Sequence, residues 1–439
     1  MELKENIISF FLNHRKDFSS SKPYIEKQRD QAIDLFEKKG FPTLKQEEWK
    51  YTNLLPLIKR SYDLEVKKAP SITYEHIRPY LIEGLDAYRL VFINGIYNKG
   101  LSDKKEVKEH VCSLLEAFSI KEYDELIKKY YGHIQDKQES LSILNNAFCR
   151  DGAFIYISKG KKIEKPIELL YFYTKGEENP YFLHPRNLIL IEKQAEVKLI
   201  ERHISLEKEP FWANTLTEIY MGEASGLDYY KLQLEEKASL IDHTFIAQER
   251  DSHAICNTFS IEGEFIRNNL NFYQKNQGVT TSLNGLSLLD KEQLVDHHTF
   301  VGHHFAHSQS YQLYKGIFGG YSKGVFNGKI QVKKEAQKTN AFQQSNAIIL
   351  SKEAIVNAKP QLEIFADDVK CSHGSTVGQL NPMALFYLRS RGIKEKEAKT
   401  LLIFAFLKEL LDKLSIPSLK LYIEKVLIKK LDTQIEANE

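Results

Sequence analysis

The feature that most constrains this chain is a long run of short β-prone segments with no convincing helix between them. The run extends from Gly152 to about Val332, and glycine, asparagine and aspartate separate its segments. Strands that recur about every dozen residues are typical of an all-β sandwich, barrel or solenoid. A solenoid suits this length best, because each rung need only bury its face against its neighbours. The segments show no strict sequence repeat, which leaves the other two architectures open.

Helical patterns flank this run on both sides. In the first sixty residues, apolar residues recur at helical spacing, and Gly40 is placed as a helix C-cap. After the run, Asn381 and Pro382 form a good helix start, and a wide apolar stripe follows within residues 395–414. We therefore expect three parts: an N-terminal helical and mixed region (1–150), a β core (151–380) and a C-terminal helical region (381–439). The stripe either docks a partner or packs on its own domain, and the sequence favours neither.

Composition and charge exclude several classes of function. The net charge is only +2, which provides no global field for binding nucleic acid or an anionic membrane. The chain has four widely spaced cysteines and no apolar run of the ~20 residues that span a bilayer. It has neither a P-loop nor a dinucleotide-binding glycine motif. We expect a cytoplasmic protein that binds neither nucleic acid nor membrane.

A histidine-rich segment, Asp296–His307, contains five of the fourteen histidines. On a strand, alternation would place His297 and His303 on one face, where they could offer two ligands to a metal beside Asp296. The alternative is that these histidines are structural and hydrogen-bond across neighbouring strands. We expect changes at His303 or His307 to cost stability first.

Cys371 and His373 form a second candidate site. Residues two apart on a strand face the same side, as a thiolate–imidazole pair or two metal ligands would require. No base-orienting residue or oxyanion donor stands nearby, so nucleophilic catalysis is disfavoured. As half of a metal or iron–sulfur site the pair is chemically sensible but lacks its other ligands. A buried, inert cysteine beside a hydrogen-bonded histidine is the structural alternative.

Several strings of the sequence closely resemble the SufB/SufD family of the SUF iron–sulfur cluster assembly system, in particular its SufD branch. The resemblance rests on residues 40–54 (GFPTLKQEEWKYTNL), 295–299 (VDHHT), 324–332 (GVFNGKIQV), 336–344 (AQKTNAFQQ), 359–380 (KPQLEIFADDVKCSHGSTVGQL) and 384–393 (ALFYLRSRGI). One departure is Asn381–Met383, where the family usually shows an acidic helix start. That difference affects only a helix cap.

The resemblance implies a right-handed parallel β-helix core with helical domains at both ends. It implies a scaffold without catalytic turnover, paired through the β-helix with a SufB-like paralogue. A SufC-like ABC ATPase would dock on the C-terminal helices, where we expect contacts at Leu385, Leu401 and Phe406. His373 matches the family's histidine at the subunit interface, where a nascent cluster assembles, and Cys371 lies beside it.

The resemblance also bears on cofactors and on the alternatives. It implies a transient iron–sulfur cluster on the complex, no cofactor held tightly by the isolated chain, and reduced flavin as a candidate cofactor of the complex. By alignment, Gln344 stands where SufB presents its essential cysteine, so a chain of the SufD type should not build a cluster alone. A SufB-like direct scaffold and a free-standing β-solenoid metalloprotein are the alternatives. Whether the isolated chain pairs with a second copy of itself is left open.

Overall fold

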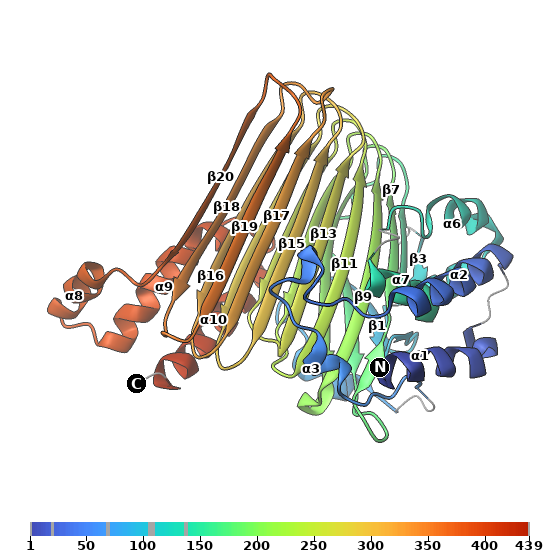
Figure 1. Ribbon diagram of the computed structural model, residues 1–439, viewed down its shortest axis with the longest axis horizontal. Helices are drawn as coiled ribbons and strands as arrows, with labels where there is room; N and C mark the ends of the chain where they lie inside the picture. The colour runs from blue at the N-terminus through green and yellow to red at the C-terminus, as the bar shows by residue number, and fades with distance from the viewer. Residues whose placement is uncertain (1, 19–21, 67–70, 104–109, 136–138, 438–439) are drawn as a thin grey trace.

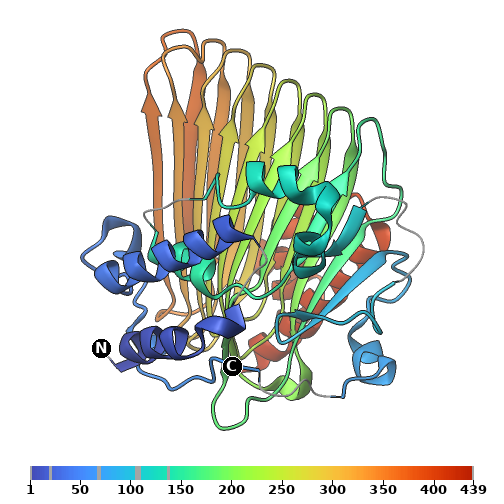
Figure 2. The same ribbon diagram turned by 90° about the vertical axis from the view of Figure 1, so that its right-hand side faces the viewer.

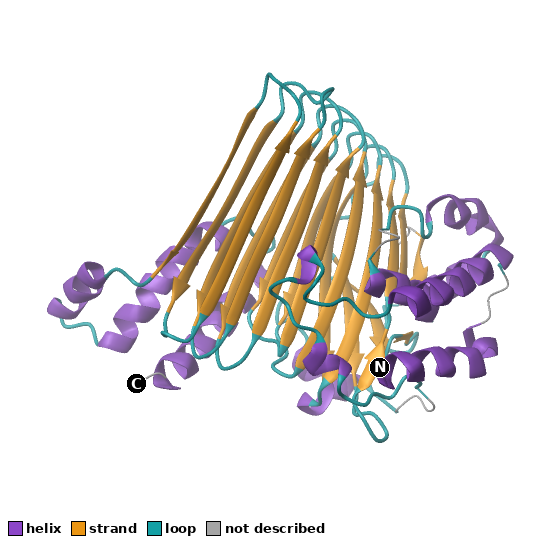
Figure 3. Cartoon of the chain, in the orientation of Figure 1, coloured by secondary structure: helices purple, strands orange, loops and turns teal. Residues whose placement is uncertain are grey.

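A computed structural model describes residues 2–18, 22–66, 71–103, 110–135 and 139–437 of this chain. Between residues 167 and 378 the chain winds into a parallel β-solenoid, and helices flank it at both ends (Figures 1 and 3). The expected solenoid is thus confirmed, and the sandwich and barrel alternatives are wrong.

Strands of the solenoid alternate between two sheets, which we call sheet A and sheet B. Sheet A contains, in spatial order, β3 (His110–Ser113), β4 (Ala153–Ile157), β7 (Arg186–Ile191), β9 (Phe211–Met221), β11 (Ala238–Gln248), β13 (Phe265–Gln274), β15 (Leu294–His303), β17 (Lys323–Val332) and β19 (Ile355–Ile364), with β6 (Tyr181–Leu183) beside β9. Sheet B contains β2 (Ile96–Tyr97), β1 (Tyr88–Ile93), β5 (Ile167–Tyr173), β8 (Glu196–Ser205), β10 (Gly226–Gln233), β12 (His253–Ser260), β14 (Thr280–Leu289), β16 (Gln309–Phe318), β18 (Asn340–Ile349) and β20 (Lys370–Gly378). The two sheets enclose a lumen that contains one large apolar core cluster.

The register explains why the sequence shows no strict repeat. In sheet B, Gly226 pairs with His253, whereas Gln309 pairs with Asn340, so one turn advances by 27 residues and another by 31. Because the connecting loops absorb the difference, hydrogen bonding between the long strands stays continuous. Inward and outward positions therefore stay aligned from turn to turn even though the spacing changes.

Local signals place the ends of several elements as expected. The N-terminal region contains α1 (Glu2–Asn13), α2 (Pro23–Lys39), α3 (Leu55–Ile58), α4 (Tyr74–Ile77), α5 (Leu114–Ser119), α6 (Asp124–Tyr130) and α7 (Ser140–Phe148). α2 ends at Gly40, whose φ of 66° few other residues adopt at low cost and whose N–H donates to the Phe36 carbonyl. Strands β1 and β2 join through Asn94 and Gly95, both at positive φ, as an Asn-Gly hairpin turn requires.

Helices cover the outer face of each sheet. The N-terminal helices α1, α2 and α7 pack against sheet A, around Trp212, Ile241 and Phe265 (Figure 2). The C-terminal region contains α8 (Pro382–Ser390), α9 (Glu395–Leu411) and α10 (Pro417–Ala437). Both α9 and α10 pack against sheet B, with Ile403 and Leu407 buried in the same cluster as strand residues. Most of the apolar stripe of residues 395–414 therefore packs on its own solenoid, which was one of the two alternatives.

Candidate functional site

Cys371 and His373 lie on β20, the last strand of sheet B, and both project from the face that lines the lumen. In register, Cys371 is opposite Ala341 and His373 is opposite Gln343, which are both buried inside the solenoid. Cys371 packs in a small inner cluster that includes Ile330. The prediction that the two residues share a face is confirmed.

This end of the solenoid is open. Strand β20 pairs only with β18, and β19 pairs only with β17, so in the described part of the chain no strand covers either edge (Figure 1). Side chains that another turn would bury are therefore exposed here, His373 among them. Proteins usually protect long strand edges, because unpaired N–H and C=O groups can pair with another chain. The open end is thus suited to contact with a second protein.

The Cys371 thiol is half-buried and has low reactivity in this chain. Burial raises its pKa, and a hydrogen bond with the backbone of Ala341 offsets only part of that effect. The thiol is therefore protonated at neutral pH. A metal ligand or a sulfur acceptor must be a thiolate, so a cation or a metal must come close before Cys371 can serve as either.

The histidine-rich segment divides between the lumen and the outer surface. His297 and His303 are buried in the lumen, where His297 contacts Ser287 at 3.0 Å and His303 contacts Ser310 at 2.8 Å. His298 lies on the outer face, with its Nε2 3.0 Å from Asp296. His307 is exposed in the turn that follows the strand, and the expected cost in stability of changing it stays a prediction.

The geometry does not support a metal held jointly by His297 and His303. They are six residues apart on one strand, a distance of about 20 Å at ~3.3 Å per residue. Asp296 points to the opposite face. Across the residues that the structure describes, no group of three or more His, Cys, Asp or Glu side chains could hold a metal ion. The prediction of a shared metal is therefore wrong, and the structural alternative accounts for both histidines.

We expect acid to destabilise the fold through these buried histidines. Burial lowers the pKa of His297 to about 4 and that of His303 to about 3. In the unfolded chain each ring takes up its proton near pH 6.5, so acidification favours unfolding. Between pH 7 and pH 5.5 each histidine should remove about 1 kcal/mol from the free energy of unfolding. Urea titrations of the parent and of His303→Gln should differ in pH slope by that amount. Equal slopes would contradict the assignment.

Gln344, which the alignment placed at the position of the SufB cysteine, points away from the lumen and from Cys371 and His373. It is exposed on the outer face of β18, and its register partner is Gly374. Its neighbours Gln343 and Ser345 face the lumen instead. None of the inward side chains of β18 is a thiol, so this strand contributes no cysteine to the open end whichever residue aligns with the SufB cysteine.

The exposed apolar surface of the C-terminal region lies mainly on α8. Met383, Phe386 and Tyr387 are 73%, 67% and 58% exposed, and α8 buries none of its residues. Figure 1 shows α8 beside β20, at the end of the solenoid opposite the N-terminal helices. Among the residues expected to dock an ATPase, Leu401 is half exposed and Leu385 is partly buried, whereas Phe406 packs under the Lys315 ammonium at 5.0 Å. Sequence reasoning missed this exposed apolar face of α8, although the spacing of Met383 with Phe386 and Tyr387, three and four residues later, was a usable signal.

The N-terminal motif at residues 40–54 is explained by contacts with sheet A. The Arg267 guanidinium lies over the Trp49 ring at 3.8 Å and donates to Asp296 at 2.5 Å. Thr52 donates to the same carboxylate at 2.5 Å. Burial alone would raise the pKa of Asp296, but His298 and Arg267 hold it down at about 2. The motif thus holds the N-terminal segment against β13 and β15 of sheet A through these contacts.

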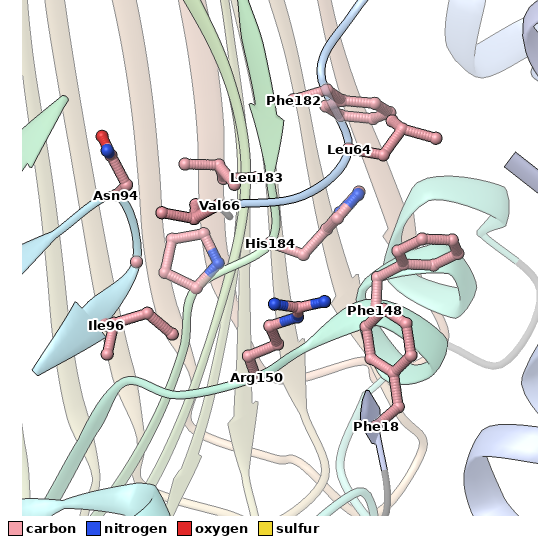
Figure 4. Close-up of a pocket in the computed structure, with 12 residues that line it drawn as sticks. Phe18, Leu64, Val66, Asn94, Ile96, Phe148, Arg150, Phe182, Leu183 and His184 are labelled. Carbon is pink, nitrogen blue, oxygen red and sulfur yellow. The ribbon is translucent and has the colours of Figure 1, made fainter. Parts of the chain in front are cut away.

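A small cavity near the first turns does not extend the candidate site. It has a volume of about 20 Å³, close to that of one water molecule, and Phe18, Phe148, Arg150 and His184 contribute to its lining (Figure 4). His184 is buried, and this burial lowers its pKa to about 3. No helix in the described ranges is long and apolar enough to cross a membrane.

Comparison with known proteins places the chain in a family. Residues 172–406 match the model of the SUF system FeS cluster assembly SufBD core domain, and residues 1–169 match the SufBD protein N-terminal region. The chain is 32% identical over 402 residues to the SufBD family protein slr0076 of Synechocystis. The aligned region covers 90% of this chain and 88% of the Synechocystis protein. It is 31% identical over 396 residues to SufD of Escherichia coli, covering 90% of each chain, and 28% identical over 322 residues to SufD of Bacillus subtilis, covering 71% and 72%. The chain therefore belongs to the SufB/SufD family of the SUF iron–sulfur cluster assembly system.

Proposed function

We propose that this chain is a SufD-like scaffold subunit that supports cluster assembly without catalytic turnover of its own. Its open solenoid end pairs with a SufB-like paralogue, and its C-terminal helices dock a SufC-like ATPase in the cytoplasm. The observation that carries the proposal is the placement of Cys371 and His373 on the lumen face of an unpaired edge. There they form half of a ligand set, and a partner seated on β19 and β20 would supply the rest.

The supply of thiols favours a SufD-like role over a SufB-like one. An iron–sulfur cluster usually requires several cysteine thiolates, and Cys371 is the only cysteine at the open end. Cys149 and Cys256 are buried, and burial raises the pKa of both thiols. Cys112 lies on β3, at the other end of sheet A. One thiol and one imidazole cannot complete a cluster, so the chain needs a partner.

The docking surface for the ATPase is the exposed apolar side of α8 together with Leu401. Phe386 and Tyr387 are large aromatic side chains at the surface, and such residues dominate the binding energy of protein interfaces.

The iron–sulfur cluster is cargo of the complex rather than a resident cofactor of this chain. Reduced flavin stays a proposal for the complex as a whole.

We expect His373→Ala to remove cluster from the complex while leaving this chain folded. His373 is exposed, so the free energy of unfolding should change by no more than ~0.5 kcal/mol. The measurement is iron and sulfide content after anaerobic reconstitution of the chain co-purified with SufB-like and SufC-like proteins. His253→Ala, at an exposed histidine of β12, is the matched control.

Two results would count against the proposal. If the His373→Ala complex loads iron and sulfide as the parent does, His373 has no part in assembly. If the isolated chain, given iron, a sulfur donor and reductant, forms a stable stoichiometric cluster, the chain is a direct scaffold of the SufB type.

A further inference from the structure

Gln343 occupies the position next to His373 on the adjacent strand. The two residues are register partners of β18 and β20, and both project from the lumen face. Facing residues on neighbouring strands lie about 5 Å apart, which brings their side chains within reach of each other. Gln343 is only 2% exposed, and its Oε1 has no hydrogen-bond partner.

The amide nitrogen of Gln343, in contrast to its oxygen, has a hydrogen-bond partner. Its Nε2 donates to Gln312 Oε1 at 3.3 Å, and the same oxygen accepts from the Thr299 hydroxyl at 2.7 Å. A short polar chain therefore runs along the lumen from Thr299 through Gln312 to Gln343. With Nε2 used as the donor to Gln312, the carbonyl oxygen of Gln343 is the acceptor that is left without a donor.

Gly328 of β17 keeps room for this side chain. A Cβ at residue 328 would lie only 1.9 Å from Gln343 Nε2, and any larger side chain would have to displace the amide. The lumen is thus shaped around Gln343 in the position that it occupies. A buried carbonyl oxygen without a donor is destabilising, so a donor that approaches Gln343 Oε1 would be favoured.

We propose that Gln343 is a positioning residue for His373: its Oε1 accepts the N–H of one ring nitrogen and leaves the lone pair of the other free for iron. A neutral imidazole carries one N–H and one lone pair, and the hydrogen bond of the first nitrogen decides which nitrogen binds a metal. Among the side chains of β20 that face the lumen, His373 lies directly opposite Gln343, whereas Cys371 lies opposite Ala341. This inference rests on the proposed function, in which His373 serves cluster assembly.

The first test examines the hydrogen bond itself in the complex with the SufB-like protein, because in the chain alone Gln343 Oε1 has no hydrogen-bond partner. With ¹⁵N-labelled histidine, the ring nitrogen shifts of His373 at pH 8.5 should report one dominant tautomer in the parent, with His373→Ala identifying the signal. Gln343→Met keeps the length of the side chain and removes the acceptor, so it should give the tautomer mixture of a solvent-exposed ring. Gln343→Glu retains an acceptor oxygen and should restore one tautomer. Gln344→Met makes the same change on the outer face and should resemble the parent.

The second test measures metal affinity in the complex with the SufB-like and SufC-like proteins, with Co²⁺ as the probe. Loss of a hydrogen-bond partner behind a metal-binding histidine typically weakens affinity 10- to 100-fold. We expect that loss for Gln343→Met, and for Gln343→Leu should the methionine variant fold poorly. Gln343→Glu and Gln344→Met should stay within about threefold of the parent.

The outcomes separate this inference from the proposed function. If His373→Ala weakens Co²⁺ binding but Gln343→Met does not, the positioning role is wrong and the function of His373 stands. If the Gln343→Met chain keeps the parent's tautomer, the hydrogen bond does not form and the inference is overturned. If His373→Ala leaves Co²⁺ affinity unchanged, the assembly role of His373 fails, and the positioning role fails with it.

Discussion

Replacing Lys231 with methionine is expected to lower the free energy of unfolding by about 3–5 kcal/mol, the usual cost of breaking a buried ion pair from one side. Lys231 Nζ lies 2.9 Å from Asp242 and 3.2 Å from Glu201, and each of the three side chains is at most 2% exposed. Burial favours neutral carboxyl groups, but the Lys231 ammonium and His203 hold the pKa of Glu201 below its usual range. Lys231 Nζ bridges the carboxylates of Glu201 and Asp242. Without it, both buried carboxylates would lose their ammonium partner.

The measurement is urea unfolding at pH 7, followed by circular dichroism and by fluorescence of Trp49 and Trp212, the only two tryptophans. Lys198→Met is the matched control, because Lys198 is only half-buried on the neighbouring strand β8. That variant should stay within ~0.5 kcal/mol of the parent. A loss below ~1 kcal/mol for Lys231→Met would show that the network contributes little to stability. Adding Asp242→Asn and Glu201→Gln to Lys231→Met should recover part of the loss, since neutral partners tolerate the missing cation.

Replacing Phe386 with aspartate is expected to abolish co-purification with the SufC-like ATPase. The ring is 67% exposed on a helix with no buried residues, so the change should leave the fold intact. An aromatic hot spot contributes about 2 kcal/mol or more to binding, which corresponds to at least a ~30-fold loss of affinity. A buried carboxylate in the interface would add a further penalty.

Binding should be measured by titrating the ATPase onto the purified chain. The control is Leu12→Asp, at an apolar residue that is 63% exposed on α1, far along the chain from α8. If Leu401→Asp abolishes binding and Phe386→Asp does not, the ATPase docks on α9 rather than α8. If both variants bind as the parent does, the proposed docking surface is wrong.

Local patterns were sufficient to predict much of the architecture. The run of β-prone segments predicted a solenoid, Gly40 predicted the end of α2, and Asn381 predicted the cap of α8, where its side chain accepts from Met383 and Ala384. Strand alternation also predicted that Cys371 and His373 share a face, and that His297 and His303 share another. Each of these predictions depends on neighbours within a few residues, which is the range over which backbone geometry is decided.

Other features depend on contacts between distant residues, and here the sequence patterns were ambiguous or misleading. The apolar stripe of α9 serves its own sheet, because the outer face of sheet B is apolar as well and must be covered. The contiguous histidines resembled a metal site, yet a fully extended strand separates His297 from His303 by too great a distance to share an ion. Alignment pointed to Gln344, whereas the register turns Gln343 toward the lumen.

The sequence by itself therefore determined the type of fold, the family and the shared face of Cys371 and His373. Only the tertiary structure decided that this face is the lumen face, that the solenoid ends open at β19 and β20, and that Gln343 stands beside His373. The physical reason is that alternation along a strand has a period of two residues and is local, while register is set by pairing between residues about thirty positions apart. Loops of unequal length hide that pairing from any pattern in the sequence.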